Sequence, residues 1–203
     1  MIGTRLRMVW KIRDDYIFGN MFSSSGKINL ESEWTFSIIE KLFDKVVHEN
    51  SLTAANYIIF GHSAGAQFVQ RMLLFKPDAR IKTAIAANAG FYTLPRSGIG
   101  FPYGLGISEL KPAMLGSAFS KKLILLLGTA DNDPNHKYLK NTPEAIAQGA
   151  HRFERGHHFF DTAKSKAEDL GMDFQWELKA VKGVGHNKLR MSESASEVIA
   201  EQS

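Results

Sequence analysis

Cysteine is absent from the 203-residue sequence, which excludes disulfides, a thiolate nucleophile and a cysteine-ligated zinc site. The sequence also lacks an uncharged apolar run of about 18 residues, the length that could cross a membrane. Its N-terminus has no apolar stretch typical of a signal peptide. The lack of a membrane span and of a signal peptide predicts a cytoplasmic protein without a membrane partner, whereas the lack of cysteine fits any compartment.

Long runs of like charge are missing as well. The formal net charge is +4, but lysine and arginine are scattered along the chain, and no five or six like charges stand together. Nucleic-acid-binding proteins concentrate their basic residues on one face or one arm. The charge pattern therefore predicts that nucleic acid is not a partner.

Strand and helix patterns alternate along the chain. Hydrophobic residues make up 44% of the sequence, and we expect residues 1–203 to form one domain with a packed core. Periodicity predicts helices over 31–50, 64–75 and 143–170 and from about residue 192, and strands over 57–60, 81–86, 122–127 and 174–181. The segment 91–120, rich in glycine, proline and aromatics, is expected to be mostly loop. This alternation predicts an α/β fold, a doubly wound, mostly parallel sheet with helices on both faces.

The motif Gly61-His62-Ser63-Ala64-Gly65 lies between an expected strand and an expected helix. A serine hydroxyl is a weak nucleophile unless it is held exposed beside a base. A Gly-x-Ser-x-Gly turn provides that exposure, and its glycines avoid collisions with the neighbouring strand and helix. Ser63 is therefore the candidate nucleophile. A glycine-rich loop is the alternative, and the His62 side chain is expected to point away from the hydroxyl and to pack.

Two further motifs follow in order: Gly128-Thr-Ala-Asp131 after one apolar strand and Gly185-His186 after another. With the serine motif they resemble the α/β-hydrolase superfamily, most closely its small esterase and polyester-depolymerase-like branches, from about residue 57 onward. The resemblance implies Ser63 as nucleophile, His186 as base, Asp131 as the acid that orients it, and the Ala64 N–H as an oxyanion donor. It implies no cofactor and no metal.

Several nearby residues offer alternatives. Asp133 competes with Asp131, although Asp131 is closer to the strand end, where a carboxylate is held rigidly. The run Asp131-Asn-Asp133-Pro-Asn135 is similar to a calcium loop, but His136 and Thr142 replace the glycine and glutamate that such a loop requires.

Two further groups of residues have more than one interpretation. His157, His158 and Asp161 could form a metal cluster, but a solvated helix face is the preferred interpretation. Phe91, Tyr92, Phe101 and Tyr103 could line a pocket for an apolar acyl chain, or simply pack within the loop.

The segment before Ser63 is short for this superfamily. Outside the expected helix, about thirty residues before Ser63 remain for strands. No His-Gly or Gly-Gly pair among them marks a loop for the first oxyanion donor. We expect that some N-terminal strands are missing; the alternative is an unusual donor, for which Gly19-Asn20 is the best local candidate. An exposed sheet edge would then favour self-association.

The sequence as a whole predicts a serine hydrolase. Its partner would be a small-molecule or polymer ester substrate, and an ester, amide or polyester bond would be cleaved through an acyl-enzyme. A catalytically silent hydrolase-fold protein that binds a partner, or a truncated fragment, is the main alternative. An acyltransferase using the same residues is the other.

Overall fold

Four parallel strands form the sheet of the computed structural model, which describes residues 12–107 and 113–201. The strands are β1 (Tyr57–His62), β2 (Ile81–Ala87), β3 (Lys122–Gly128) and β4 (Trp176–Val181), and they lie side by side in that order. In the register, Gly61 pairs with Ala86 and Leu125 with Leu178. All four strands therefore end at the same edge of the sheet.

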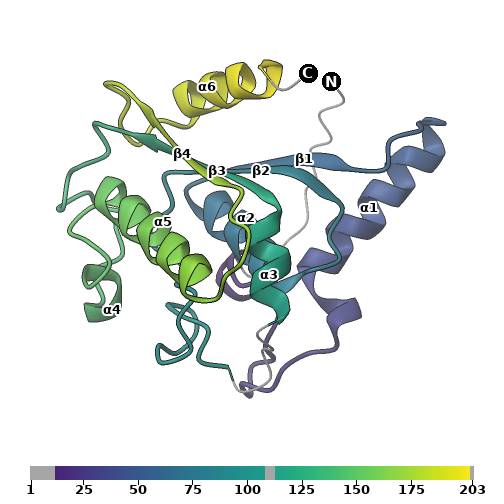
Figure 1. Cartoon of the computed structure of the whole chain (residues 1–203), viewed down its shortest axis with the longest axis horizontal. Helices are drawn as coiled ribbons and strands as arrows, with labels where there is room; N and C mark the ends of the chain where they lie inside the picture. The colour runs from purple at the N-terminus through teal and green to yellow at the C-terminus, as the bar shows by residue number, and fades with distance from the viewer. Residues whose placement is uncertain (1–11, 108–112, 202–203) are drawn as a thin grey trace.

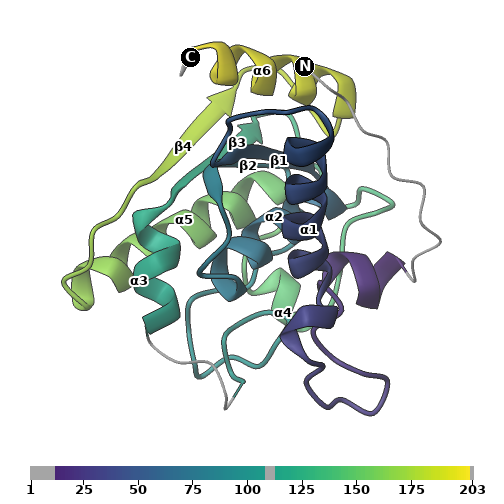
Figure 2. The same cartoon turned by 90° about the vertical axis from the view of Figure 1, so that its right-hand side faces the viewer.

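Helices cover both faces of this sheet, as expected. The short turns η1 (Ile12–Ile17) and η2 (Glu31–Glu33) precede α1 (Thr35–Glu49), α2 (Ala64–Phe75), α3 (Ala113–Ser120), α4 (Pro143–Ile146), α5 (Arg152–Asp169) and α6 (Lys188–Ala200). Helices α2, α3 and α5 lie on one face, and α6 lies on the other (Figures 1 and 2). Since the strand order advances in one direction, right-handed crossovers place those three helices on the same face.

The core is divided by the sheet into two clusters. The larger cluster joins the sheet to α2, α3 and α5 and includes Phe68, Met72, Phe119 and Phe159, each less than 5% exposed. The smaller cluster lies between the sheet and α6, and Met191 is its most deeply buried helical residue. The strand β3 contributes to both clusters because its side chains alternate between the two faces.

The prediction of one continuous helix over residues 143–170 is wrong. It is interrupted between α4 and α5, where Gly149 has a φ of 144°. The imidazole of His151 then accepts a hydrogen bond from the N–H of Glu154 and caps the N-terminus of α5, which begins at Arg152. A glycine that favours a non-helical backbone and a side-chain cap thus override the helical periodicity.

Other differences concern where helices begin. The segment expected to be mostly loop over 91–120 contains α3 at its end. The first long helix begins at Thr35, because Trp34 is extended and only η2 precedes it. The last helix begins at Lys188, four residues earlier than expected, since the Asn187 side chain accepts a hydrogen bond from the N–H of Arg190 and caps it.

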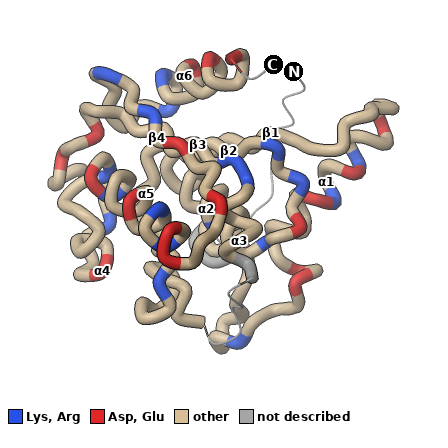
Figure 3. Tube along the Cα trace, viewed as in Figure 1, with Lys and Arg blue, Asp and Glu red and all other residues tan. Residues whose placement is uncertain are grey.

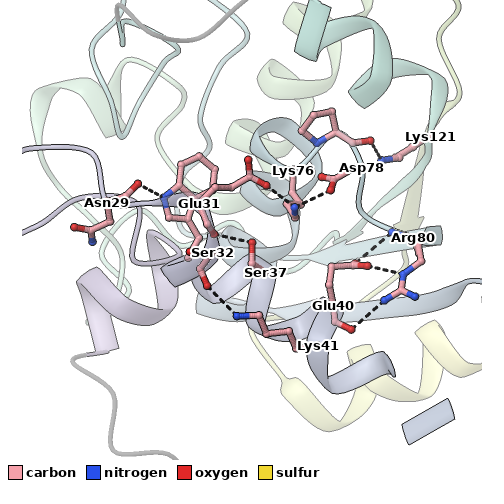
Figure 4. Close-up of polar contacts among 12 residues, drawn as sticks. Asn29, Glu31, Ser32, Ser37, Glu40, Lys41, Lys76, Asp78, Arg80 and Lys121 are labelled. Atoms are coloured by element: carbon pink, nitrogen blue, oxygen red, sulfur yellow. Dashed lines mark hydrogen bonds and ion pairs between the residues drawn. The ribbon is translucent and has the colours of Figure 1, made fainter. Parts of the chain in front are cut away.

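Ion pairs tie the N-terminal elements to the rest of the fold, and the lysine of one of them is buried. Lys76, at the end of α2, contacts Glu31 at 2.5 Å and Asp78 at 2.8 Å (Figure 4). The guanidinium of Arg80 contacts Glu40 of α1 at 2.8 Å in the same view. Elsewhere, acidic and basic residues are interspersed along α1 and α5 (Figure 3).

Candidate active site

The chain turns sharply at Ser63, between β1 and α2. Ser63 has a φ of 58° and a ψ of −113°, an uncommon conformation for a residue with a side chain. A Cβ atom on Gly61 would lie 2.2 Å from the carbonyl oxygen of Gly65, so glycine is required there. The Ser63 N–H donates to the Ala87 carbonyl at 2.9 Å and fixes the turn against β2. The strand-to-helix turn predicted from the motif is therefore present.

Three of the residues predicted from the sequence meet in one hydrogen-bonded chain. Nε2 of His186 lies 3.0 Å from Oγ of Ser63, and Nδ1 lies 2.7 Å from Oδ2 of Asp131. An ionised carboxylate only accepts, so Nδ1 carries the proton and Nε2 of the neutral ring accepts from the Ser63 hydroxyl. This arrangement can remove a proton from the serine.

Of the two candidate acids, the structure brings Asp131 to His186. Asp131 is 3% exposed. Burial by itself would raise the pKa of Asp131, but the hydrogen bond from His186, the charge that this ring has when protonated, and the charge and hydrogen bond of Arg152 lower it below its ordinary value. Asp133 is exposed, and its carboxylate accepts from the N–H of Asn135 within the turn.

Asn88, a residue that the sequence did not single out, joins the strand ends that carry these side chains. It is fully buried and follows β2. Its Oδ1 accepts from the N–H of Gly128 at 2.8 Å, and its Nδ2 donates to the carbonyl of Gly185 at 3.3 Å. Asn88 therefore holds the segments before Asp131 and His186 together. A lone asparagine after a strand carries no sequence signal for that role.

Two further imidazoles lie against His186. The centre of the His62 ring lies 4.6 Å from the centre of the His186 ring, and the centre of the His136 ring lies 5.3 Å from it. Burial lowers the pKa of His62 to about 4, and the charge of His186 adds to the effect. His62 is therefore a neutral packing partner at neutral pH, and it is His186 that hydrogen-bonds to Ser63. The contact of His136 was not expected from the sequence.

A cavity of about 620 Å³ opens beside Ser63. Its wall includes Ser63, Ala64, Phe91 and Tyr103, so two of the four loop aromatics line it. The other two pack elsewhere: Tyr92 stacks on Phe159, and Phe101 contacts Phe18, Phe22 and Phe75. The charged residues of the described cavity wall are Lys137 and Lys140.

Arg71 contacts another part of this wall without lining the cavity itself. It is fully buried on α2 and donates to the carbonyl of Ile17 at 3.2 Å and to Oγ1 of Thr93 at 3.0 Å. Burial lowers the pKa of Arg71 to about 9. Its guanidinium lies about 5 Å from the ring centres of Phe18 and Phe91. Arg71 thereby holds Ile17 and Phe18, two residues of the cavity wall.

The local donor candidate Gly19-Asn20 does not lie on the cavity wall. The N–H of Gly19 donates to the carbonyl of Tyr16, and the side-chain Nδ2 of Asn20 donates to the carbonyl of Glu33. The N–H of Ala64 is at the first position of α2, where no preceding helical turn offers an acceptor.

Over 12–107 and 113–201, no group of three His, Asp or Glu side chains is arranged to hold a metal ion. No helix within those ranges is long and apolar enough to span a bilayer.

Known structures resemble this chain over most of its length. A poly(aspartic acid) hydrolase from Sphingomonas sp. KT-1 is 40% identical to this chain, with a TM-score of 0.88. The match covers 91% of this chain and 70% of the chain of that hydrolase. A poly(3-hydroxybutyrate) depolymerase from Bordetella parapertussis is 29% identical with a TM-score of 0.87, covering 94% and 66%. A siderophore hydrolase from Aspergillus nidulans, 15% identical with a TM-score of 0.50, covers 96% and 67% and shares the fold. No protein-family model and no curated protein sequence matches the chain.

Proposed function

Because the chain belongs to the α/β-hydrolase superfamily, we propose that it is a serine hydrolase that cleaves an ester or amide bond through an acyl-enzyme. The observation that carries the proposal is the hydrogen-bonded chain from Ser63 through His186 to Asp131. It begins at a strained turn that presents the hydroxyl to a cavity. Such a chain supplies a nucleophile, a base and the group that orients the base.

The proposed reaction has two halves. Oγ of Ser63 attacks the substrate carbonyl carbon while Nε2 of His186 takes its proton, and the N–H of Ala64 donates to the oxyanion. The intermediate collapses, the bond to the leaving oxygen or nitrogen breaks, and His186 gives that atom the proton. Water then attacks the acyl-enzyme with His186 as base, which releases the acid and restores Ser63.

A fluorophosphonate probe tests the nucleophile. We expect stoichiometric labelling on the peptide that contains Ser63, and loss of labelling in Ser63→Ala with an unchanged circular dichroism spectrum. Ser120→Ala, an exposed serine at the end of α3, is the matched control and should label like the wild type. Labelling that persists in Ser63→Ala would show that another residue is the nucleophile. A wild-type protein that does not label would favour the silent binding protein.

The cavity charge supports a narrower substrate class. The names of the two most similar proteins given above indicate a polyanionic amide polymer for one and a neutral polyester for the other. Lys137 and Lys140 supply the charge of the described cavity wall, which favours a substrate that carries carboxylates. We therefore favour an anionic polymer over a neutral polyester.

Salt dependence distinguishes the two substrates. Hydrolysis of poly(aspartate) should weaken as salt is raised, because exposed charges are screened, whereas hydrolysis of a neutral ester should change little. Lys137→Gln with Lys140→Gln should raise KM for poly(aspartate) only. The control pair Lys164→Gln with Lys182→Gln lies away from the cavity wall. Equal KM changes in both pairs would contradict the anionic preference.

A further inference from the structure

Asp131 has a different partner on each of its carboxylate oxygens. Oδ2 accepts from Nδ1 of His186 at 2.7 Å, and Oδ1 accepts from Nη1 of Arg152 at 3.1 Å. The side chains of Asp131 and Arg152 are 2% and 1% exposed. In addition, the N–H of Phe153 donates to the Asp131 carbonyl at 3.3 Å, so the first turn of α5 holds the residue at both ends. The carboxylate cannot rotate away from His186 without breaking the buried contact to Arg152.

Arg152 also reaches the segment that lines the cavity. Its Nη2 lies 3.3 Å from Nδ1 of His136. A guanidinium has only donors, so Nδ1 of His136 accepts and the proton of that neutral ring is on Nε2. Burial lowers the pKa of His136, and the charges of Arg152 and His186 lower it further, which favours this neutral ring. His136 directly precedes the cavity residues 137–140.

We propose that Arg152 is a positioning residue: it holds Asp131 ionised and aimed at His186 and, through His136, sets the cavity wall beside the same histidine. The inference rests on the proposed serine-hydrolase function. Arg152 is enclosed by the fold and is not among the residues of the cavity wall, so it acts on the reaction through Asp131 and His136, the side chains that it contacts.

The charges around this pair determine the direction of the expected effect. Asp131 faces His186 and Arg152, and the rings of His62, at the end of β1, and His136 also lie near His186. The charge of Lys188 lowers the pKa of His62, and the charge of Asp133 raises the pKa of His136. Replacing Arg152 by a neutral residue removes a positive charge that lowers the pKa of Asp131, while the burial that raises it remains. The carboxylate would then take up a proton at a higher pH.

The Nδ1 proton that His186 donates to Asp131 gives a readout that needs no turnover. In a proton NMR titration of the Ser63→Ala protein, we expect a far-downfield resonance that persists to acidic pH. Adding Arg152→Gln should raise the pH at which it disappears. Arg155→Gln is the matched control: this arginine is also buried on α5, but it donates to the carbonyls of Gly90 and Gly149.

Kinetics with Ser63 intact gives the second readout. For a small neutral ester, Arg152→Gln should lower kcat by roughly ten- to a hundredfold, because misplacing the base costs rates of this order. If Arg152→Gln does not fold, Arg152→Lys replaces it. Lysine keeps the charge beside Asp131 but has one nitrogen, so it should preserve the resonance and raise KM severalfold through loss of the His136 contact.

These outcomes separate the inference from the function. A resonance whose pH of loss is equal in Arg152→Gln and Arg155→Gln, or an Arg152→Lys protein with the KM of the wild type, would overturn the positioning role. A resonance that responds as expected in a protein that never labels or hydrolyses an ester would instead overturn the serine-hydrolase function.

Discussion

At the scale of single residues, the two neighbouring aspartates offer a sharp test. Asp131→Asn should lower kcat by up to about ten-thousandfold, the size of the effect when the acid of a serine protease is replaced, because an amide cannot fix the His186 tautomer. Asp133→Asn removes an exposed carboxylate only two residues away and should change kcat less than twofold. Steady-state hydrolysis of a chromogenic ester measures both. A larger loss in Asp133→Asn would reverse the two assignments.

His62 predicts how stability depends on pH. Its pKa falls from about 6.5 to about 4 on folding, so between these values the unfolded chain binds the proton and the folded protein does not. Stability is therefore full above pH 6.5 and is lost as the pH falls toward 4, by roughly 2–3 kcal/mol. Urea denaturation of wild type and His62→Gln at several pH values should show a smaller pH dependence in the variant. Parallel curves would contradict the assignment.

At the scale of elements, the sequence predicted most strands and helices because their apolar periodicity matches the burial that they have. β3 is a run of leucine and isoleucine, and it is buried on both faces. The break before α5 was missed because Gly149 and His151 act through backbone angle and capping, which periodicity does not register. Arg152 was missed for a related reason, since its contact with Asp131 spans 21 residues and has no local pattern.

The break before α5 is itself testable. A Cβ atom at Gly149 would lie 2.7 Å from Cβ of Glu154, in addition to the strain of a φ of 144°. Gly149→Ala should therefore lower the free energy of unfolding by about 1–3 kcal/mol more than Gly171→Ala does. Gly171 also has a positive φ, of 60°, but nothing lies within 4 Å of its added Cβ. Chemical denaturation compares the two. Equal losses would mean that Gly149 tolerates a side chain.

At the scale of the whole molecule, β1 predicts self-association. Within residues 12–107 and 113–201, β1 pairs with β2 alone, so its other edge presents backbone donors and acceptors. The apolar side chains of Ile38, Leu42 and Val46 on the neighbouring α1 are only half-buried. We expect light scattering to detect a concentration-dependent dimer.

A matched pair of leucines tests the location of that contact. Leu52, 42% exposed, lies in the connection from α1 to β1, whereas Leu189, 69% exposed, lies on α6. Leu52→Lys should shift the equilibrium toward monomer, and Leu189→Lys should leave it unchanged. A protein that stays monomeric at every concentration would contradict the prediction.

The hydrogen-bonded chain at the strand ends joins positions that are far apart in the polypeptide. Ser63 and His186 are separated by 123 residues, and Asp131 and His186 by 55. Closing contacts of such long range is a slow part of folding. Labelling of Ser63 by the probe consequently reports the last stage of folding. During refolding, it should return only with the slowest phase, after the circular dichroism signal of the helices has been regained.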